Sequence, residues 1–229
     1  MNKIEEYIKN QKIVHEQKNI TLHGSTPVVV KDDLINDGIS LASVISKIET
    51  IVPKFFTYGL DSIYVGDFDQ FNDRGINAFY DDGSLYISNF QDDEADMIDD
   101  IVHEIAHHVE ENHGMDIYGD KRLEKEFLGK RKRLYSILKN AGYDVTLEEF
   151  LNINYDEGFD MFLYQNIGYE KLNNLVMGLF PGAYSVTSLA EYFAVGFEQF
   201  YMKQGSKLSR MCPILIKKID LLDELANEY

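Results

Sequence analysis

The sequence is poor in several residue types, and these shortages exclude some structural classes. Its 229 residues include one cysteine, four prolines and no tryptophan. A single cysteine, Cys212, cannot form a disulfide within the chain, so we expect it to serve as a small buried hydrophobic residue. No run approaches the roughly 18 apolar residues of a membrane span. Residues 1–9 lack the apolar core of a signal peptide, which leaves open a cytoplasmic location, export by another route, or a chain numbered after removal of its leader.

Basic residues are also scarce. Lysine and arginine total 22 against 39 acidic residues, giving a net charge of −17. Binding of a nucleic-acid backbone requires clustered cationic side chains, so we expect no nucleic-acid partner. The one basic cluster, residues 130–133, falls in a predicted helix shortly after Glu124 and Glu126, which predicts an exposed, salt-bridged helix surface. A neutral or cationic peptide fits the charge of the chain better.

Apolar residues make up 45% of the chain, with 15 tyrosines and 14 phenylalanines, which is enough for a sizeable core. The length fits a single domain over residues 1–229. Short apolar patterns predict strands at 27–30 and 62–66, a hairpin from 75–80 and 84–88 about the turn 81–83, and helices at 3–18 and 40–52. The second half is predicted to be largely helical, at 120–140, 147–152, 156–166, 169–180, 187–203 and 208–227. Strands followed by helices indicate an α+β fold.

A His-Glu-x-x-His pattern at residues 103–107 is the strongest functional signal. It lies in an apolar stripe that predicts a helix over 92–112, ended by Gly114. Side chains at i and i+4 share a helix face, so His103 and His107 can bind one Zn²⁺ while Glu104 points toward a water molecule. The other histidines, including His108, are expected to be exposed.

Acidic residues crowd the start of that helix. They suit the positive end of the helix dipole, which predicts a solvated helix start. The alternative is that Asp99 or Asp100 orients one of the zinc-binding histidines through a hydrogen bond.

Two histidines are an incomplete site, because a catalytic zinc has three protein ligands and one open position. Glu157 and Glu191 both fall near the start of predicted apolar helices, and either can supply the third ligand. A structural zinc would instead need four protein ligands. Composition and spacing leave the choice between the two glutamates open.

The segment 184–194 resembles the signature of the anthrax lethal factor metalloprotease domain and its smaller relatives, the secreted Pro-Pro endopeptidases. In that family a tyrosine lies seven residues before a zinc-binding glutamate, as Tyr184 does before Glu191. The pattern at 103–107 and the last helix are similar too. The resemblance implies a zincin-like fold, in which a small mixed sheet packs on the active-site helix. It also implies His103, His107 and Glu191 as ligands, Glu104 as general base and Tyr184 as a hydrogen-bond donor to the reacting carbonyl.

Two features depart from that family. The interval between the histidines and Glu191 is longer, so residues 121–169 are predicted to be a helical insertion. The family has a carboxylate one turn after the ligand glutamate, where this chain has Val195. Another group must then orient the zinc histidine.

These observations predict a zinc endopeptidase with one Zn²⁺ per chain and a protein or peptide as substrate. The hairpin is where we expect the substrate to add as an extended strand. The resemblance implies a secreted enzyme, either a toxin or a protease of surface proteins. The alternative is a non-catalytic lethal factor-like module that docks onto a partner protein.

Overall fold

The computed structural model describes residues 20–74 and 76–228. The predicted helix over 3–18 lies outside the described residues. The fold is α+β, as predicted from the sequence. The chain divides into two compact units, Met1–His108 and Val109–Tyr229, which are described separately below. One domain with a helical insertion stays a prediction.

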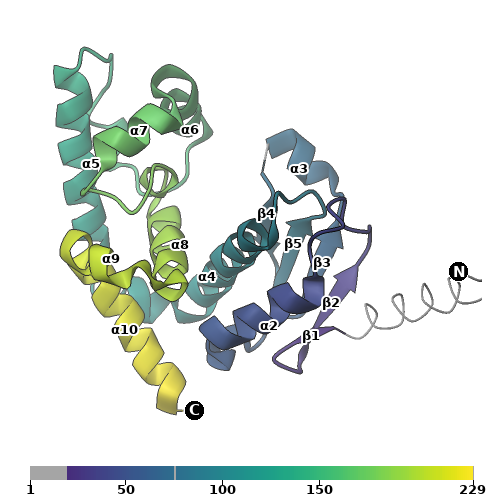
Figure 1. Ribbon diagram of the computed structural model, residues 1–229. Coiled ribbons are helices and arrows are strands. Elements are labelled where there is room, and N and C mark those ends of the chain that lie inside the picture. The colour runs from purple at the N-terminus through teal and green to yellow at the C-terminus, as the bar shows by residue number, and fades with distance from the viewer. Residues whose placement is uncertain (1–19, 75, 229) are drawn as a thin grey trace, which may run out of the picture. The chain divides into compact units, whose positions relative to one another are not determined.

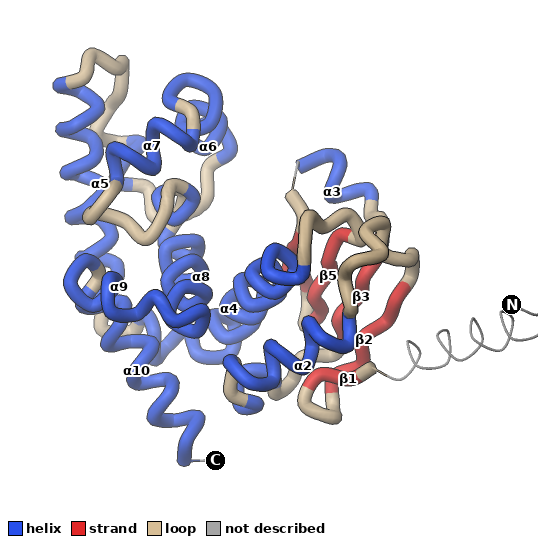
Figure 2. The backbone as a smooth tube through the Cα atoms, in the orientation of Figure 1, coloured by secondary structure: helices blue, strands red, loops and turns tan. Residues whose placement is uncertain are grey.

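The first unit is built on a five-stranded mixed sheet, drawn in red in Figure 2. Its strand order is β1-β2-β3-β5-β4. The central pairs β2–β3 and β3–β5 are parallel, whereas β1 and β4 pair antiparallel with their neighbours at the two edges. The strands are β1 (Thr21–Leu22), β2 (Thr26–Val30), β3 (Ser62–Gly66), β4 (Ala78–Asp81) and β5 (Ser84–Ser88).

The predicted strands and the hairpin are confirmed, with one difference. The sequence predicted a buried strand at 27–30, but β2 is buried on one face only, and Val29 is 41% exposed. The hairpin turns at Asp82 and Gly83, which both have positive φ. Consecutive positive φ values match the right-handed twist of a tight hairpin, and Asp-Gly is among the pairs that adopt them.

One face of the sheet is apolar and covered. Val28, Ile63 and Leu85 lie in register across the three inner strands, and all are buried. The helix α2 (Leu41–Ile51) and the first turns of α4 (Glu94–Tyr118) lie along this face (Figure 1). Helix α2 matches the prediction for 40–52 to within a residue, because the Ser40 hydroxyl accepts a hydrogen bond from the Ser43 amide and Pro53 follows its end.

The opposite face of the sheet is aromatic. Tyr86 stacks between Tyr64 and Phe79, with ring centroids 5.3 and 4.6 Å apart. Phe71, on the short helix α3 (Asp69–Arg74), packs edge-on against Phe79. Stacked cross-strand aromatic pairs stabilise neighbouring strands, so this row fixes the register of β3, β5 and β4.

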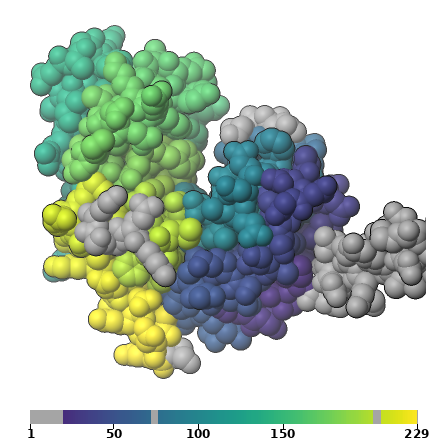
Figure 3. All heavy atoms as spheres, in the orientation of Figure 1, coloured from purple at the N-terminus to yellow at the C-terminus, as the bar shows by residue number. Residues whose placement is uncertain are grey.

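The elements of the second unit are helices and helical turns joined by loops, and Figure 3 shows in green the segment of α6 and α7 at its surface. The end of α4 leads into it. The further helices are α5 (Arg122–Asn140), α6 (Glu157–Met161), α7 (Tyr169–Val176), α8 (Leu189–Gln199), α9 (Gly205–Met211) and α10 (Pro213–Glu228). Single turns occur at Glu149–Leu151 and Tyr184–Val186, and π-helical turns at Phe162–Ile167 and Phe200–Gln204.

The basic cluster on α5 corrects a prediction. Lys132 and Arg133 are exposed as expected, but Lys130 and Arg131 are buried. The Lys130 ammonium donates hydrogen bonds to the carbonyls of Leu179 and Met211, at 2.7 and 2.6 Å. Four consecutive helical residues point in four directions. Half of such a cluster can therefore face the core when carbonyl groups there accept hydrogen bonds from its cationic side chains.

The predicted helix over 208–227 is two helices, α9 and α10, separated at Cys212. Proline cannot donate a backbone hydrogen bond, and Pro213 begins the second helix. The Glu126 carboxylate accepts hydrogen bonds from the amides of Ile214 and Leu215 and so caps α10. Cys212 is fully buried, which confirms its expected hydrophobic role.

None of the helices described here combines the length and the apolar character needed to cross a bilayer.

Two glycines give opposite predictions for stability. A Cβ on Gly196 of α8 would lie 2.9 Å from Cγ of the buried Leu215 and closer still to Cδ2, so Gly196→Ala should lower the free energy of unfolding by about 1–3 kcal/mol through overpacking. A Cβ on Gly129 of α5 meets nothing within 4 Å, so Gly129→Ala should raise it by about 0.5–1 kcal/mol through helix propensity. Denaturant unfolding followed by circular dichroism measures both. Equal effects of the two variants would contradict the packing of α8 on α10.

Candidate metal centre

Helix α4 presents His103 and His107 on one face. Its apolar stripe, including Ile101, Val102 and Ile105, is fully buried, whereas the two histidines are half-buried on another side. Their ring centroids are 5.1 Å apart, as expected one turn apart on a helix. The helical context predicted for the motif is therefore confirmed.

The predicted end of this helix is confirmed in part. Two helical segments meet at a kink at His113 (φ −120°, ψ 21°), next to the predicted end at residue 112, but Gly114 does not stop the helical chain, which continues to Tyr118. Glycine weakens a helix by only about 1 kcal/mol, which tertiary packing readily offsets. Tyr118 shows such packing, because its ring lies edge-on to Phe193 of α8, with ring centroids 6.5 Å apart.

Glu104, the predicted general base, is 6% exposed. It directly follows His103 and lies three residues before His107 on the same helix. Its carboxylate is therefore shielded from bulk water on the helix that carries both histidines.

His108 was expected to be exposed, and this is wrong. It is 3% exposed, and its ring nitrogens lie 3.2 Å from the Tyr80 hydroxyl and 2.9 Å from the Tyr58 carbonyl oxygen. The side chain next to His107 points about 100° further round the helix, toward the covered face of the sheet. Two polar partners satisfy the buried ring, so His108 is a packing residue.

Glu191 lies in the first turn of α8. The Ser188 hydroxyl caps this helix by accepting a hydrogen bond from the Glu191 amide at 3.0 Å. Serine followed three residues later by glutamate is the usual pattern of a capping box. The cap therefore fixes the backbone of Glu191, from which the carboxylate projects.

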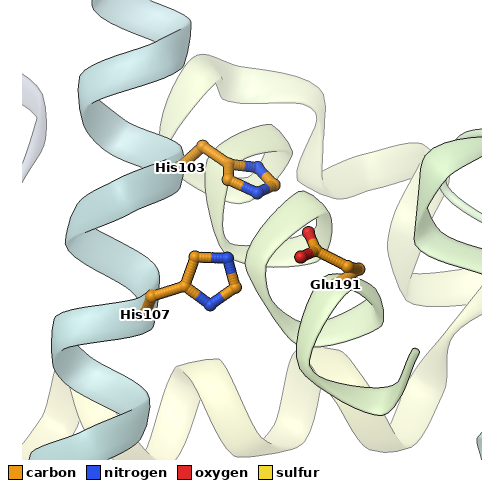
Figure 4. A group of neighbouring side chains, drawn as sticks. All are labelled: His103, His107 and Glu191. Carbon is orange, nitrogen blue, oxygen red and sulfur yellow. The ribbon is translucent and has the colours of Figure 1, made fainter. Parts of the chain in front are cut away.

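The structure brings three of the predicted residues together. Ligand atoms of His103, His107 and Glu191 all lie within 4.8 Å of one another. Figure 4 shows the two rings projecting from one helix toward the carboxylate on α8. The rival candidate Glu157 is exposed and does not belong to this group.

The donor set fits zinc. Imidazole nitrogen and carboxylate oxygen are both zinc ligands at about 2.0–2.2 Å, so two ligands of one ion are at most about 4 Å apart. The limit of 4.8 Å between the ligand atoms of this group exceeds that value by less than about 1 Å. Within residues 20–74 and 76–228, the group has three members, which matches a catalytic rather than a structural zinc site.

Asp100 lies one turn before His103 on α4. Its carboxylate accepts a hydrogen bond from the Gln91 amide at 3.0 Å. Burial raises the Asp100 pKa to about 6, although Gln91 and His103 both act to lower it. The charge interaction with His103 keeps Asp100 a candidate for orienting this ring, as predicted from the sequence for Asp99 or Asp100.

Tyr184 begins the single turn Tyr184–Val186, just before the cap of α8. Its carbonyl accepts hydrogen bonds from the amide and the hydroxyl of Thr187, at 3.0 and 2.8 Å. Burial, followed by the negative charge of Glu191, raises the pKa of the Tyr184 phenol well above its usual value. The phenol therefore stays protonated at neutral pH and can act as a hydrogen-bond donor.

One further group was not predicted from the sequence. Asp160 accepts hydrogen bonds from the hydroxyls of Tyr155 and Tyr169. Burial and the hydrogen bonds to Asp160 raise the pKa of both tyrosines, and the negative charge of Glu191 adds to the shift. Spacings of five and nine residues across two helices match no local periodicity, so only the tertiary structure reveals the group.

No family model matches the chain, and neither a curated protein nor a solved structure matches it.

Zinc binding tests the assignment of Glu191. The chain should bind about one Zn²⁺, and Glu191→Ala should weaken binding by roughly a hundredfold or more because it removes one of three ligands. Competition against a chromophoric chelator measures the dissociation constant. Glu157→Ala is the matched control and should leave it unchanged. Equal affinities of wild type and Glu191→Ala would exclude Glu191 as a ligand.

Proposed function

We propose that the chain is a zinc-dependent endopeptidase with a zincin-like fold. The observation that carries the proposal is the proximity of His103, His107 and Glu191, with Glu104 buried on the same helix as the two histidines. Three ligands leave one coordination position for water or substrate, which is the arrangement of hydrolytic zinc enzymes. The resemblance of residues 184–194 to the lethal factor family supports the same function.

A zinc ion held by these three residues would polarise the scissile carbonyl and make water a better nucleophile at neutral pH. Glu104 accepts the proton of the attacking water and then donates it to the leaving amine. Both proton transfers use the same carboxylate, which is buried and lies on the helix of the two histidines. Asp100, one turn earlier on α4, acts indirectly by orienting His103.

Tyr184 stabilises the negative charge that develops on the carbonyl oxygen. Its protonated phenol, near Glu191, donates a hydrogen bond to that oxygen. A donor that is already oriented before reaction needs no reorganisation in the transition state.

The substrate is an extended peptide that adds to the edge of the sheet. Strand β4 (Ala78–Asp81) ends the strand order, so its outer backbone groups face no neighbouring strand in the described sheet. An extended segment can pair with such an edge through main-chain hydrogen bonds. The net charge of −17 favours neutral or cationic peptides.

Incubation with a proteome-derived peptide library tests the activity directly. Mass spectrometry of the products should reveal new termini that share a sequence pattern around the cut. Cleavage should stop after zinc removal by 1,10-phenanthroline and return on addition of ZnCl₂. Zinc binding without cleavage would favour a non-catalytic module.

Glu104→Gln should lower kcat by roughly a hundredfold to ten-thousandfold, since the amide cannot accept the proton of water. Zinc affinity should be unchanged, because Glu104 is not a ligand. The rate is measured on the best peptide of the library and the affinity by chelator competition. Glu148→Gln, which alters an exposed carboxylate, is the control. An active Glu104→Gln variant would exclude this residue as the base.

Tyr184→Phe should lower kcat by roughly tenfold to a thousandfold, the range for loss of one donor to the oxyanion. The ring and its packing remain, so KM should change little. Steady-state kinetics on the same peptide separate the two constants. Tyr164→Phe, which removes the hydroxyl of a 59% exposed tyrosine, should leave both unchanged. A wild-type rate for Tyr184→Phe would remove this residue from the mechanism.

A further inference from the structure

A carboxylate shared by two tyrosines lies close to the proposed catalytic residues of the helical unit. We call Tyr155, Asp160 and Tyr169 the phenol cluster. The Tyr155 hydroxyl donates to one oxygen of Asp160 at 2.8 Å, and the Tyr169 hydroxyl donates to the other. Both oxygens of one carboxylate are thus engaged. Hydrogen bonds to a charged acceptor are roughly twice as strong as neutral ones, so the three side chains hold one another in place.

The backbone beneath the cluster is also fixed. The Asp156 carboxylate caps α6 by accepting a hydrogen bond from the Phe159 amide, and the Asp160 amide donates to the Asp156 carbonyl. The Phe159 side chain is buried, with the Arg131 guanidinium 4.2 Å from its ring centroid. Asp160 therefore projects from a segment anchored to the core.

Tyr169 connects the phenol cluster to Tyr184. Their ring centroids are 6.4 Å apart with an interplanar angle of 80°, which is an edge-to-face contact. Burial raises the pKa of all three tyrosines, and the negative charges of Asp160 and Glu191 add to the shift. The three tyrosines and Asp160 therefore lie close together.

The orientation of the Tyr184 phenol depends on its neighbours. Tyr184 begins a single turn, and rotation about its two side-chain bonds is restricted by the groups that pack against its ring, which include Tyr169. Tyr169 is a neighbour whose own orientation is fixed by the hydrogen bond to Asp160. A misplacement of about 1 Å at a reacting group can cost a hundredfold in rate, so fixing this ring has a kinetic value.

We propose that the phenol cluster positions Tyr184, with Asp160 and Tyr169 acting as positioning residues for its phenol. This inference rests on the proposed function, because it assigns a purpose to the orientation of Tyr184. Neither positioning residue needs to touch the substrate. The inference also gives a role to the predicted insertion over 121–169, whose last residue is Tyr169.

Kinetics of variants in the phenol cluster test whether it positions Tyr184. On the best peptide of the library, Tyr169→Phe should lower kcat about threefold to tenfold, the effect of losing one hydrogen bond, with little change in KM. Asp160→Ala should lower kcat further than Asp160→Asn, which retains one accepting oxygen. Tyr164→Phe is the matched control, because the Tyr164 ring also lies against Tyr169, with centroids 5.7 Å apart.

The double variant Tyr169→Phe/Tyr184→Phe decides whether the effect passes through Tyr184. If Tyr169 acts only through that phenol, its loss should have no further effect once the Tyr184 hydroxyl is absent. Losses that multiply in the double variant, or a change confined to KM, would overturn the proposal.

A second readout needs neither zinc nor a substrate. In the metal-free chain labelled with ¹³C at the tyrosine ε positions, the Tyr184 signal is assigned by its absence from Tyr184→Phe. It should shift more in Tyr169→Phe and Asp160→Ala than in Tyr164→Phe. A Tyr184 signal that stays in place in both cluster variants would overturn the coupling. If no peptide is cleaved, the proposed function is wrong, and this spectrum alone decides whether the phenol cluster holds Tyr184.

Discussion

The buried guanidinium of Arg131 is the interaction on which the helical unit depends. It is 1% exposed and donates hydrogen bonds to the carbonyls of Glu149, Asn152 and Thr187, at 2.7, 2.8 and 3.4 Å. Burial lowers the Arg131 pKa to about 10, which still leaves the group charged at neutral pH. A buried charge without partners costs several kcal/mol, so the three carbonyls that bind its terminal nitrogens offset much of this cost and are held in place by it.

That constraint reaches the candidate metal centre through the backbone. Thr187 directly precedes Ser188, the cap of α8, and the next amide, of Leu189, donates to the Ile153 carbonyl at 2.8 Å. The start of α8 is therefore tied to the segment 149–153 by two independent contacts. The Glu191 carboxylate projects from this start. The segment 149–153, part of the predicted insertion over 121–169, thus determines where the candidate third ligand lies.

Sequence patterns correctly predicted those helices and strands whose formation depends on neighbouring residues. Helix α2, strand β3 and the hairpin were all predicted, because apolar periodicity, capping residues and turn residues act within a few positions. The positions of His103 and His107 on one helix followed in the same way. The failures have a different cause. Gly114, His108 and Arg131 each behave as distant residues dictate, through packing or hydrogen-bond partners that the sequence near them does not contain. Glu191 is an intermediate case. Its place at the start of a capped helix follows from nearby residues, but its proximity to the histidines depends on residues that are distant in the sequence.

The sole thiol offers a way to follow the folded state of the helical unit. Cys212 lies at the break between α9 and α10 with no exposed surface, and burial raises its pKa. The thiolate is the reactive form, so both effects protect the native chain against alkylating reagents. Labelling with such a reagent therefore has to wait for a transient opening of these helices, and its rate reports how often they separate, at one position and without any engineered probe.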